Sequence, residues 1–193
     1  LEIVIQAAEA MQAAHEAGIV HRDIKPANLL VRANGSSGDV HVFVTDFGIG
    51  QIIADELLRG GTRLGFTRTV ADLPRSPLSG TMLYLAPEVM EGSSATARSD
   101  IYSLGVVLWQ LLIGNLRAAL DPADWPSRVT DPLLRDDLTR CLAGSPEKRW
   151  ASAGELAASL RALPERRAAE SRRRAEFVIR ERAAYRRGVM RTA

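Results

Sequence analysis

The sequence predicts an α+β fold that is mainly helical and contains one small β-hairpin. Helical spacing of apolar residues and helix-end signals predict four helices, at residues 1–17, 101–113, 131–142 and 152–163. A short apolar run over residues 29–32 and alternating side chains over residues 40–45 predict two strands, with the turn Asn-Gly-Ser-Ser-Gly between them. The predicted hairpin therefore follows the first helix directly.

Local signals predict where the longer helices end. Gly18 follows the first helix and is a suitable stop. We expect Ser99 and Asp100 to cap the apolar helix that follows them, and Gly114 with Asn115 to end it. Residues 50–79 show no sustained period and are rich in Gly, Thr, Ser and Arg, which predicts a long loop with a functional role.

Length and composition indicate a globular protein. The chain has 193 residues, of which 46% are hydrophobic, and this suffices for one domain with a core. Its single cysteine, Cys141, excludes an internal disulfide and fits a reducing compartment, so we expect a cytoplasmic protein. No signal peptide opens the sequence, and the longest apolar stretch, residues 101–113, is too short to span a bilayer.

Charge is divided unevenly along the chain. From Arg161 onward eleven arginines stand against four glutamates, a net charge of +7, while the whole chain carries +2, so residues 1–160 carry −5. Pro164 marks the end of the apolar pattern. The sequence therefore predicts a domain over residues 1–164 and a basic, helical tail over residues 165–193.

Two polar runs flank the predicted hairpin. His21-Arg22-Asp23-Ile24-Lys25-Pro26-Ala27-Asn28 precedes its first strand, and Asp46-Phe47-Gly48 follows its second. They supply a carboxylate suited to act as a base, a lysine that can reach a phosphate, and two oxygen-bearing side chains that can hold a metal ion. Phosphoryl transfer to a protein hydroxyl needs these groups in this order.

These runs and several motifs downstream resemble the C-terminal lobe of bacterial members of the eukaryotic-type Ser/Thr protein kinases. The resemblance covers about residues 1–163. Besides the two runs, the motifs that carry it are Gly80-Thr81, Ala86-Pro87-Glu88, Asp100 with Gly105, and Arg149. It implies a protein-kinase-like fold whose hairpin carries the catalytic loop at one end and Asp-Phe-Gly at the other.

The resemblance also implies roles in catalysis with ATP and Mg²⁺. Asp23 would be the base that accepts the proton of a substrate Ser or Thr hydroxyl, and Lys25 would place positive charge on the transferred phosphate. Asn28 and Asp46 would hold Mg²⁺. Leu30, with its two neighbours in the strand, would form an apolar floor beneath the adenine.

Other motif residues would be structural. His21 and Phe47 would pack together, and Asp100 would hold the backbone of the catalytic loop through charge-assisted hydrogen bonds. Glu88 and Arg149 would form a buried ion pair that anchors the activation segment. His15 is expected to pack on the first helix without a metal-ligand partner.

The resemblance also suggests a regulatory site. In similar kinases the residue at the position of Arg22 meets a phosphate on the activation segment, for which the candidate acceptors here are Thr62, Thr67, Thr69, Ser76 and Ser79. The alternative is a solvated Ser/Thr-rich loop without phosphate. Thr81 is expected to contact Asp23 and Lys25 instead.

The sequence departs from the family in three places. It has no glycine-rich phosphate loop or strand lysine ahead of the first helix, so we expect residues 1–193 alone to be inactive. Residues 115–130 lack the helix that such kinases use to dock substrates. The tail is either a solvated charged helix or a stretch that leads into a membrane tether at the cytoplasmic face, whereas no nucleic-acid partner is expected.

Two other functions fit the sequence less well than a Ser/Thr protein kinase. A catalytically silent kinase-like binding module need not retain Asp23, Asn28 and Asp46, so their presence argues against it. A small-molecule phosphotransferase of related fold would lack Gly80-Thr81 and Ala86-Pro87-Glu88. The parent protein is therefore expected to phosphorylate proteins.

Overall fold

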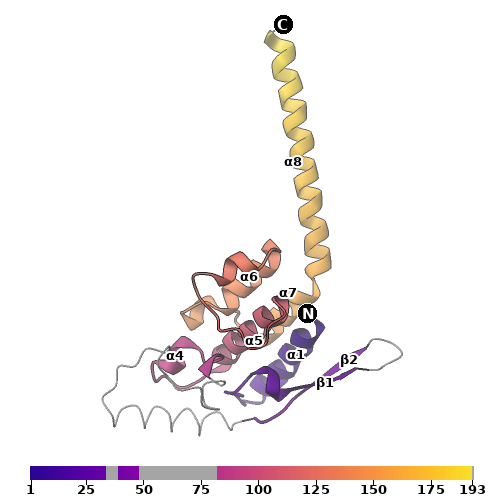
Figure 1. The fold of residues 1–193 in the computed structure, drawn as a ribbon. Helices are drawn as coiled ribbons and strands as arrows, with labels where there is room; N and C mark the ends of the chain where they lie inside the picture. The colour runs from indigo at the N-terminus through magenta and orange to yellow at the C-terminus, as the bar shows by residue number, and fades with distance from the viewer. Residues whose placement is uncertain (34–38, 48–81, 193) are drawn as a thin grey trace. The chain divides into compact units, whose positions relative to one another are not determined.

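The computed structural model describes residues 1–33, 39–47 and 82–192, with side chains up to residue 182. It forms two compact units, Leu1–Leu160 and Arg161–Ala193. The first contains most of the helices and the hairpin (Figure 1). The boundary expected at Pro164 falls inside the last helix, and the independence of the two parts stays a prediction.

Helices dominate the first unit. The α-helices are α1 (Glu2–Glu16), α4 (Pro87–Met90), α5 (Ala97–Leu112), α6 (Pro132–Cys141) and α7 (Ala153–Arg161), and the 3-10 turns are η1 (Pro26–Asn28), η3 (Trp125–Arg128) and η4 (Pro146–Lys148). Helix α1 buries one face, which includes Val4, Ile5 and Met11. It contacts both α5 and β2, while α5 also contacts α6. Helix α5 is therefore the centre of the core.

The predicted hairpin is present. Strand β1 (Leu29–Ala33) pairs antiparallel with β2 (Val40–Val44), with Leu29 opposite Val44 and Ala33 opposite Val40. The two polar runs meet at the end of the hairpin opposite its turn, because η1 leads into β1, Asp46 follows β2, and Leu29 pairs with Val44. The turn at residues 34–38 lies outside the described residues.

The expected start of α5 is wrong. The helix begins at Ala97, two residues before the predicted cap, and Thr96 is the N-cap. Thr96 and Ser99 form a capping box in which the backbone N–H of Thr96 donates to Ser99 Oγ at 3.0 Å. Ser99 therefore lies inside the first turn. The predicted cap role of Asp100 is also wrong, since its carboxylate is engaged elsewhere.

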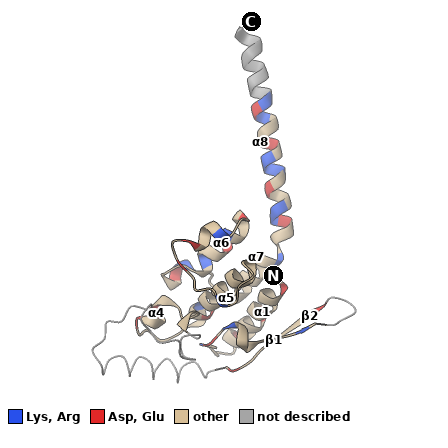
Figure 2. Ribbon diagram, viewed as in Figure 1, with Lys and Arg blue, Asp and Glu red and all other residues tan. Residues whose placement is uncertain are grey.

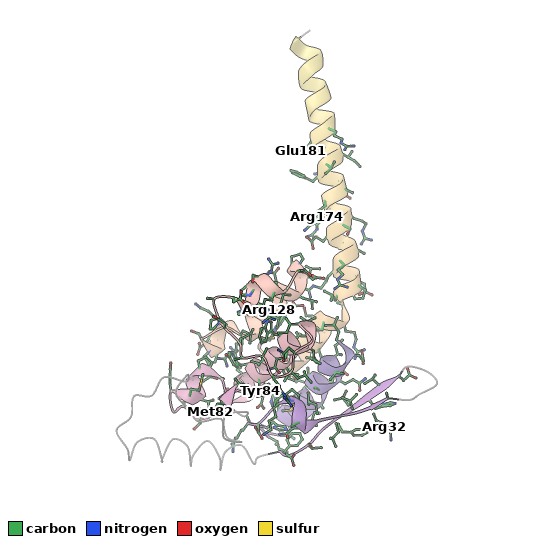
Figure 3. All side chains as sticks on the ribbon, in the orientation of Figure 1. Arg32, Met82, Tyr84, Arg128, Arg174 and Glu181 are labelled. Atoms are coloured by element: carbon green, nitrogen blue, oxygen red, sulfur yellow. The ribbon has the colours of Figure 1, made fainter. Side chains whose placement is uncertain are left out.

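The segment ahead of α4 is tied to α5 by a buried hydrogen-bond chain. Tyr84, labelled in Figure 3, donates its hydroxyl proton to Gln110 Oε1 at 2.9 Å, and Gln110 Nε2 donates to Ala118 O at 2.8 Å. Ser103 Oγ donates to Tyr84 O at 2.7 Å. Burial raises the pKa of Tyr84 above its ordinary value. Helix α5 thus holds the chain just before Ala86-Pro87-Glu88.

The second unit is dominated by helix α8 (Leu163–Thr192). Arginines and glutamates are interspersed along its described part, as the colours of the ribbon in Figure 2 show. Phe177, Val178 and Ile179 interrupt this pattern and are exposed. Within the described residues, no helix has the length and apolar character that crossing a bilayer requires.

Candidate active site

The catalytic loop adopts a strained backbone. Arg22 has a φ angle of 71°, in the left-handed region that side chains other than glycine seldom occupy. Such a residue costs on the order of 1–3 kcal/mol and persists only where its surroundings hold it. Its neighbours His21 and Asp23 are buried. The loop therefore needs fixed partners on both sides of Arg22.

Asp100 supplies these partners from the first turn of α5. Its Oδ2 accepts from the backbone N–H of His21 at 2.9 Å, and its Oδ1 accepts from the backbone N–H of Arg22 at 2.8 Å. The side chain is 1% exposed, so these charge-assisted bonds operate away from bulk water. The predicted contact between Asp100 and the catalytic-loop backbone is confirmed.

His15, which the sequence predicts only to pack on the first helix, also contacts this carboxylate. Its Nε2 lies 2.8 Å from Asp100 Oδ2, and its side chain is 9% exposed. Donation to a carboxylate requires a proton on Nε2. The only sequence signal was a histidine in the last turn of the helix before the catalytic loop. That signal does not identify a partner 85 residues away.

The two carboxylate oxygens of Asp23 differ in their hydrogen bonds. Oδ2 accepts from Lys25 Nζ at 2.7 Å and from Asn28 Nδ2 at 3.2 Å, and Asn28 Nδ2 also donates to Asp23 O at 2.8 Å. Oδ1 is buried and has no hydrogen-bond partner among the residues that the structure describes. An unpartnered carboxylate oxygen is costly unless a ligand uses it. The geometry suits a base whose orientation is set by its neighbours.

A second set of bonds joins the loop to the end of β2. The backbone N–H of Thr45 donates to Asn28 O at 3.0 Å. The backbone N–H of Asp23 lies 3.3 Å from His21 Nδ1, which makes that nitrogen the acceptor, so His21 Nε2 carries the proton and donates to Thr45 O at 2.8 Å. Asp46 follows directly, exposed and with a φ angle of 63°. The two motifs are therefore parts of one hydrogen-bonded site.

The ring of His21 also packs against Phe47, as the sequence predicts. The two ring centroids are 4.6 Å apart with the planes tilted by 45°. His21 is fully buried, while Phe47 is 41% exposed. The contact thus joins the buried side of the site to its exposed face.

The three strand residues expected beneath the adenine do not share one face of the hairpin: Leu30 lies on one face, and Leu29 and Val31, the latter 47% exposed, lie on the other. Leu30 is 54% exposed and lies opposite Phe43, which is 50% exposed. Arg32, labelled in Figure 3, lies on the same face with its guanidinium carbon 5.6 Å from the centroid of the Phe43 ring. Successive side chains on a strand point to opposite faces. The expectation that Leu29 and Val31 join Leu30 is therefore wrong, and Leu29 is buried.

The predicted ion pair between Glu88 and Arg149 is present. Arg149 Nη2 lies 2.6 Å from Glu88 Oε2, and Nη1 donates to Glu88 Oε1 at 2.8 Å. Ser99 Oγ donates to Glu88 Oε1 at 2.7 Å. Arg149 also donates to the carbonyl oxygens of Arg98, Ala143 and Gly144. The pair thus ties α4 to the start of α5 and to the turn before η4.

The electrostatics of this pair favour the charged carboxylate. Burial by itself raises the pKa of Glu88, but hydrogen bonds from Arg149 and Ser99 outweigh burial and bring the pKa below its ordinary value of 4.5. The Arg149 side chain is 0% exposed and that of Glu88 is 14% exposed. The pair is therefore a shielded anchor rather than a surface contact.

The protein kinase domain family matches residues 2–153, which include every motif described above. The chain belongs to this family. PknB of Mycolicibacterium smegmatis, a serine/threonine-protein kinase, is 35% identical over 175 residues, 83% of this chain and 25% of PknB. PkaA of Streptomyces coelicolor, also a serine/threonine-protein kinase, is 36% identical over 176 residues, 84% of this chain and 29% of PkaA.

A solved structure shows the same fold. The kinase domain of Mycobacterium tuberculosis PknI superposes with a TM-score of 0.56 at 27% identity, over 83% of this chain and 53% of that domain. The kinase chain thus spans about a quarter of the length of the curated relatives it matches and about half of this solved domain. The helical unit with its hairpin corresponds to a kinase C-terminal lobe.

Protein kinases use ATP and Mg²⁺, and two side chains of this kinase fit the metal. Because Asn28 Nδ2 donates to Asp23, the Oδ1 of the same amide is the atom that a cation could use. Asp46 is exposed at the adjoining strand end. The described residues contain no group of three or more His, Cys, Asp or Glu side chains able to hold a metal. Mg²⁺ commonly takes one or two protein ligands and completes its shell with phosphates and water.

Several predicted site residues fall outside the described part of the kinase. They are Gly48, Thr81 and the five candidate phosphate acceptors, Thr62, Thr67, Thr69, Ser76 and Ser79. The partner proposed for Arg22 therefore stays a prediction, as does the contact of Thr81 with Asp23 and Lys25.

Proposed function

We propose that this protein, in its full-length form, transfers the γ-phosphate of Mg-ATP to Ser or Thr side chains of other proteins. The observation that carries the proposal is the state of Asp23. One oxygen is fixed by Lys25 and Asn28, and the other is buried without a described partner. A substrate hydroxyl placed against Oδ1 would satisfy this atom and give up its proton to it.

The residues of the site would divide the work of the reaction. Mg-ATP, when bound, supplies the phosphoryl group and most of the charge neutralisation. Asp23 Oδ1 accepts the hydroxyl proton as the new O–P bond forms and the bond from the γ-phosphorus to the departing ADP oxygen breaks. Lys25 is held 2.7 Å from Asp23 Oδ2 and adds positive charge beside the transferred group. Asn28 and Asp46 would hold the Mg²⁺ ion.

Two features support protein Ser/Thr as the acceptor. Lys25, within Asp23-Ile24-Lys25-Pro26-Ala27-Asn28, matches the pattern of Ser/Thr kinases rather than tyrosine kinases. The similar proteins PknB and PkaA bear the name serine/threonine-protein kinase.

Asp23→Asn in the full-length protein tests the proposal. The amide keeps the size of the side chain but cannot accept the proton, so phosphorylation of a generic protein substrate should fall about 100- to 10,000-fold. Asp136→Asn, which changes an exposed carboxylate on α6, is the matched control and should keep wild-type activity. Equal activity of the Asp23→Asn and wild-type proteins would exclude Asp23 as the base. A wild-type protein that binds Mg-ATP without transfer would favour the silent binding module.

Residues 1–193 alone are expected to lack appreciable activity. They contain the catalytic loop but no glycine-rich loop and no strand lysine to hold the ATP phosphates. Phosphorylation of a generic substrate by the purified 193-residue chain would contradict this expectation. A membrane tether beyond the basic tail stays a prediction.

A further inference from the structure

The outer edge of β2 has no strand beside it among the described residues. β1 covers one edge of β2, and the groups that point from the other edge include the carbonyl of Val40 and the N–H of Val42. Backbone groups on an open edge need partners, and a side chain or loop often supplies them. The partners of these backbone groups therefore determine how β2 is fixed to the rest of the domain.

A single side chain on α1 covers the edge. Gln6 Nε2 donates to Val40 O at 2.7 Å, and Gln6 Oε1 accepts from the backbone N–H of Val42 at 3.0 Å. The other Nε2 proton goes to Glu2 Oε1 at 2.8 Å. The amide thus reproduces the donor and acceptor of a neighbouring strand. Both of its protons and its oxygen are engaged, so its orientation is fixed.

This contact lies on the strand that leads to the part of the site that would hold the metal, with Val42 four residues before Asp46. Strand β2 ends at Val44, and Thr45 and Asp46 follow without an intervening turn. Asp46 has a φ angle of 63°, so its position depends on how the strand before it is held. We propose that Gln6 is a positioning residue for Asp46: it fixes β2 to α1 and thereby sets where the Asp46 carboxylate meets Mg²⁺. This inference rests on the proposed function.

Helix α1 would then align both halves of the site. Near its C-terminus His15 contacts Asp100, which holds the backbone of His21 and Arg22. Near its N-terminus Gln6 holds β2. One rigid helix thus sets the spacing between the base and the metal ligand. The two contacts can be broken separately, so their effects should separate as well.

Glutamine suits this position better than the residues that resemble it in size or chemistry. Glutamate has no proton to give Val40 O and would place a negative oxygen against it. Leucine offers neither a donor nor an acceptor. Asparagine keeps the amide but is one methylene shorter, so it cannot reach both backbone groups at hydrogen-bond distance.

Amide hydrogen exchange on the 193-residue chain tests the contact itself. In Gln6→Leu the Val42 N–H loses its acceptor and should exchange at least about tenfold faster, since a lost hydrogen bond of about 1.4 kcal/mol changes the opening equilibrium tenfold. The His21 and Arg22 amides should keep wild-type rates. The control is Gln12→Leu, the same change two turns along α1, where Gln12 bonds Gly154 N and Glu16. It should leave Val42 protected, and an unchanged Val42 rate in Gln6→Leu would overturn the inference.

The Mg²⁺ dependence of phosphoryl transfer in the full-length protein tests the positioning role. Gln6→Leu should raise the Mg²⁺ concentration for half-maximal rate about tenfold, the lower end of what losing an outer contact to a metal ligand costs. Gln12→Leu should match wild type. Loss of Val42 protection with wild-type Mg²⁺ dependence would show that Gln6 holds the strand without positioning Asp46, and this outcome would overturn the inference.

Two further outcomes are informative. If Gln6→Leu does not fold, Gln6→Asn is the replacement variant, with the same expected direction in both measurements. If the wild-type protein shows no Mg-dependent transfer, the proposed function fails and the metal part of this inference fails with it. The exchange rate of Val42 would still decide whether Gln6 holds β2.

Discussion

The two sides of the catalytic loop differ in how they are built. The helical side contains charged groups that are almost fully buried: Asp100, at 1% exposure, bonds the backbone of the loop, and Arg149, at 2%, bonds Glu88. On the hairpin side, Leu30, Phe43 and Phe47 are 41% to 54% exposed. Asp23, the proposed base, lies in the chain between Arg22, which Asp100 bonds, and the first strand of the hairpin. The helical side therefore holds the site in place, whereas the exposed apolar side chains of the hairpin side are available to contact a ligand.

The buried charges explain how a strained loop can persist. Taking a carboxylate out of water costs several kcal/mol unless its oxygens are matched by donors. Asp100 meets this condition with two backbone N–H groups and His15. An uncharged acceptor would bind the same N–H groups less strongly. The cost of burial and the strain at Arg22 are therefore offset by the same set of bonds.

Among variants of the helical side, Glu88→Ala should have the largest effect on stability. It leaves the Arg149 guanidinium buried without its counter-charge, and losing one partner of a buried pair typically costs about 3–5 kcal/mol. Urea unfolding followed by circular dichroism measures the loss. Glu91→Ala, at an exposed carboxylate in the same segment, is the control and should change stability by less than about 0.5 kcal/mol. A Glu88→Ala protein as stable as wild type would contradict the role of the pair.

The same pair gives a pH dependence with a definite sign. Because the pKa of Glu88 is lower in the folded than in the unfolded protein, the pair contributes its full stability above the ordinary pKa of 4.5 and loses it as the pH falls through the folded value. The stability difference between wild type and Glu88→Gln should therefore shrink on acidification from pH 7. A difference that stays constant below pH 4.5 would speak against a lowered pKa.

Asp100→Asn should have the next largest effect. The amide keeps the shape of the side chain, but its NH₂ group cannot accept from a backbone N–H, so one of the two loop bonds is lost. Hydrogen bonds to charged groups contribute about 1.5–3 kcal/mol, and unfolding in urea should show a loss of this size. Faster exchange of the His21 or Arg22 amide should accompany it. Asp136→Asn serves as control, and unchanged exchange at both amides would refute the anchoring role.

Gly105→Ala tests how tightly the helical side is packed. A Cβ at this position would lie 2.5 Å from Cys141 Cβ, closer than carbon atoms approach, and 3.3 Å from Leu142 Cδ2, a tight contact. Helices α5 and α6 would have to move apart, at a cost of about 1–3 kcal/mol. Thermal unfolding measures it, with Gly144→Ala as the control because nothing lies within 4 Å of a Cβ there. Equal melting temperatures for the two variants would show that this helix pair tolerates expansion.

Features that depend on contacts between residues close in sequence could be predicted, whereas most contacts between distant residues could not. The hairpin and most helices arise from spacing and turn residues that neighbours in sequence supply. The Glu88–Arg149 pair and the contacts of Asp100 came from the resemblance to kinases, since no local rule links residues so far apart. The contacts of Gln6 and His15 span 36 and 85 residues and had no signal of either kind. Only packing of α1 against β2 and α5 brings those groups together.

Two errors have simpler physical causes. The start of α5 was placed late because Ser99 and Asp100 both look like caps, while Thr96 completes a capping box that needs Ser99 at its third position. Leu29 was grouped with Leu30 because both are apolar, although the alternation of a strand places them on opposite faces. Both features follow from rules on neighbouring residues, the capping box and the alternation of a strand. In each case an adjacent residue of similar chemistry suggested a different assignment.

The smallest expected effect lies on the hairpin side and uses two adjacent residues. Leu30→Ala removes a side chain that is 54% exposed and should change the free energy of unfolding by less than about 0.5 kcal/mol. Leu29→Ala, the same change one residue earlier at 7% exposure, should cost about 2–5 kcal/mol because it leaves a cavity. A large loss for Leu30→Ala in the 193-residue chain would mean that the hairpin face supports this unit, and the division between a holding side and a binding side would fail.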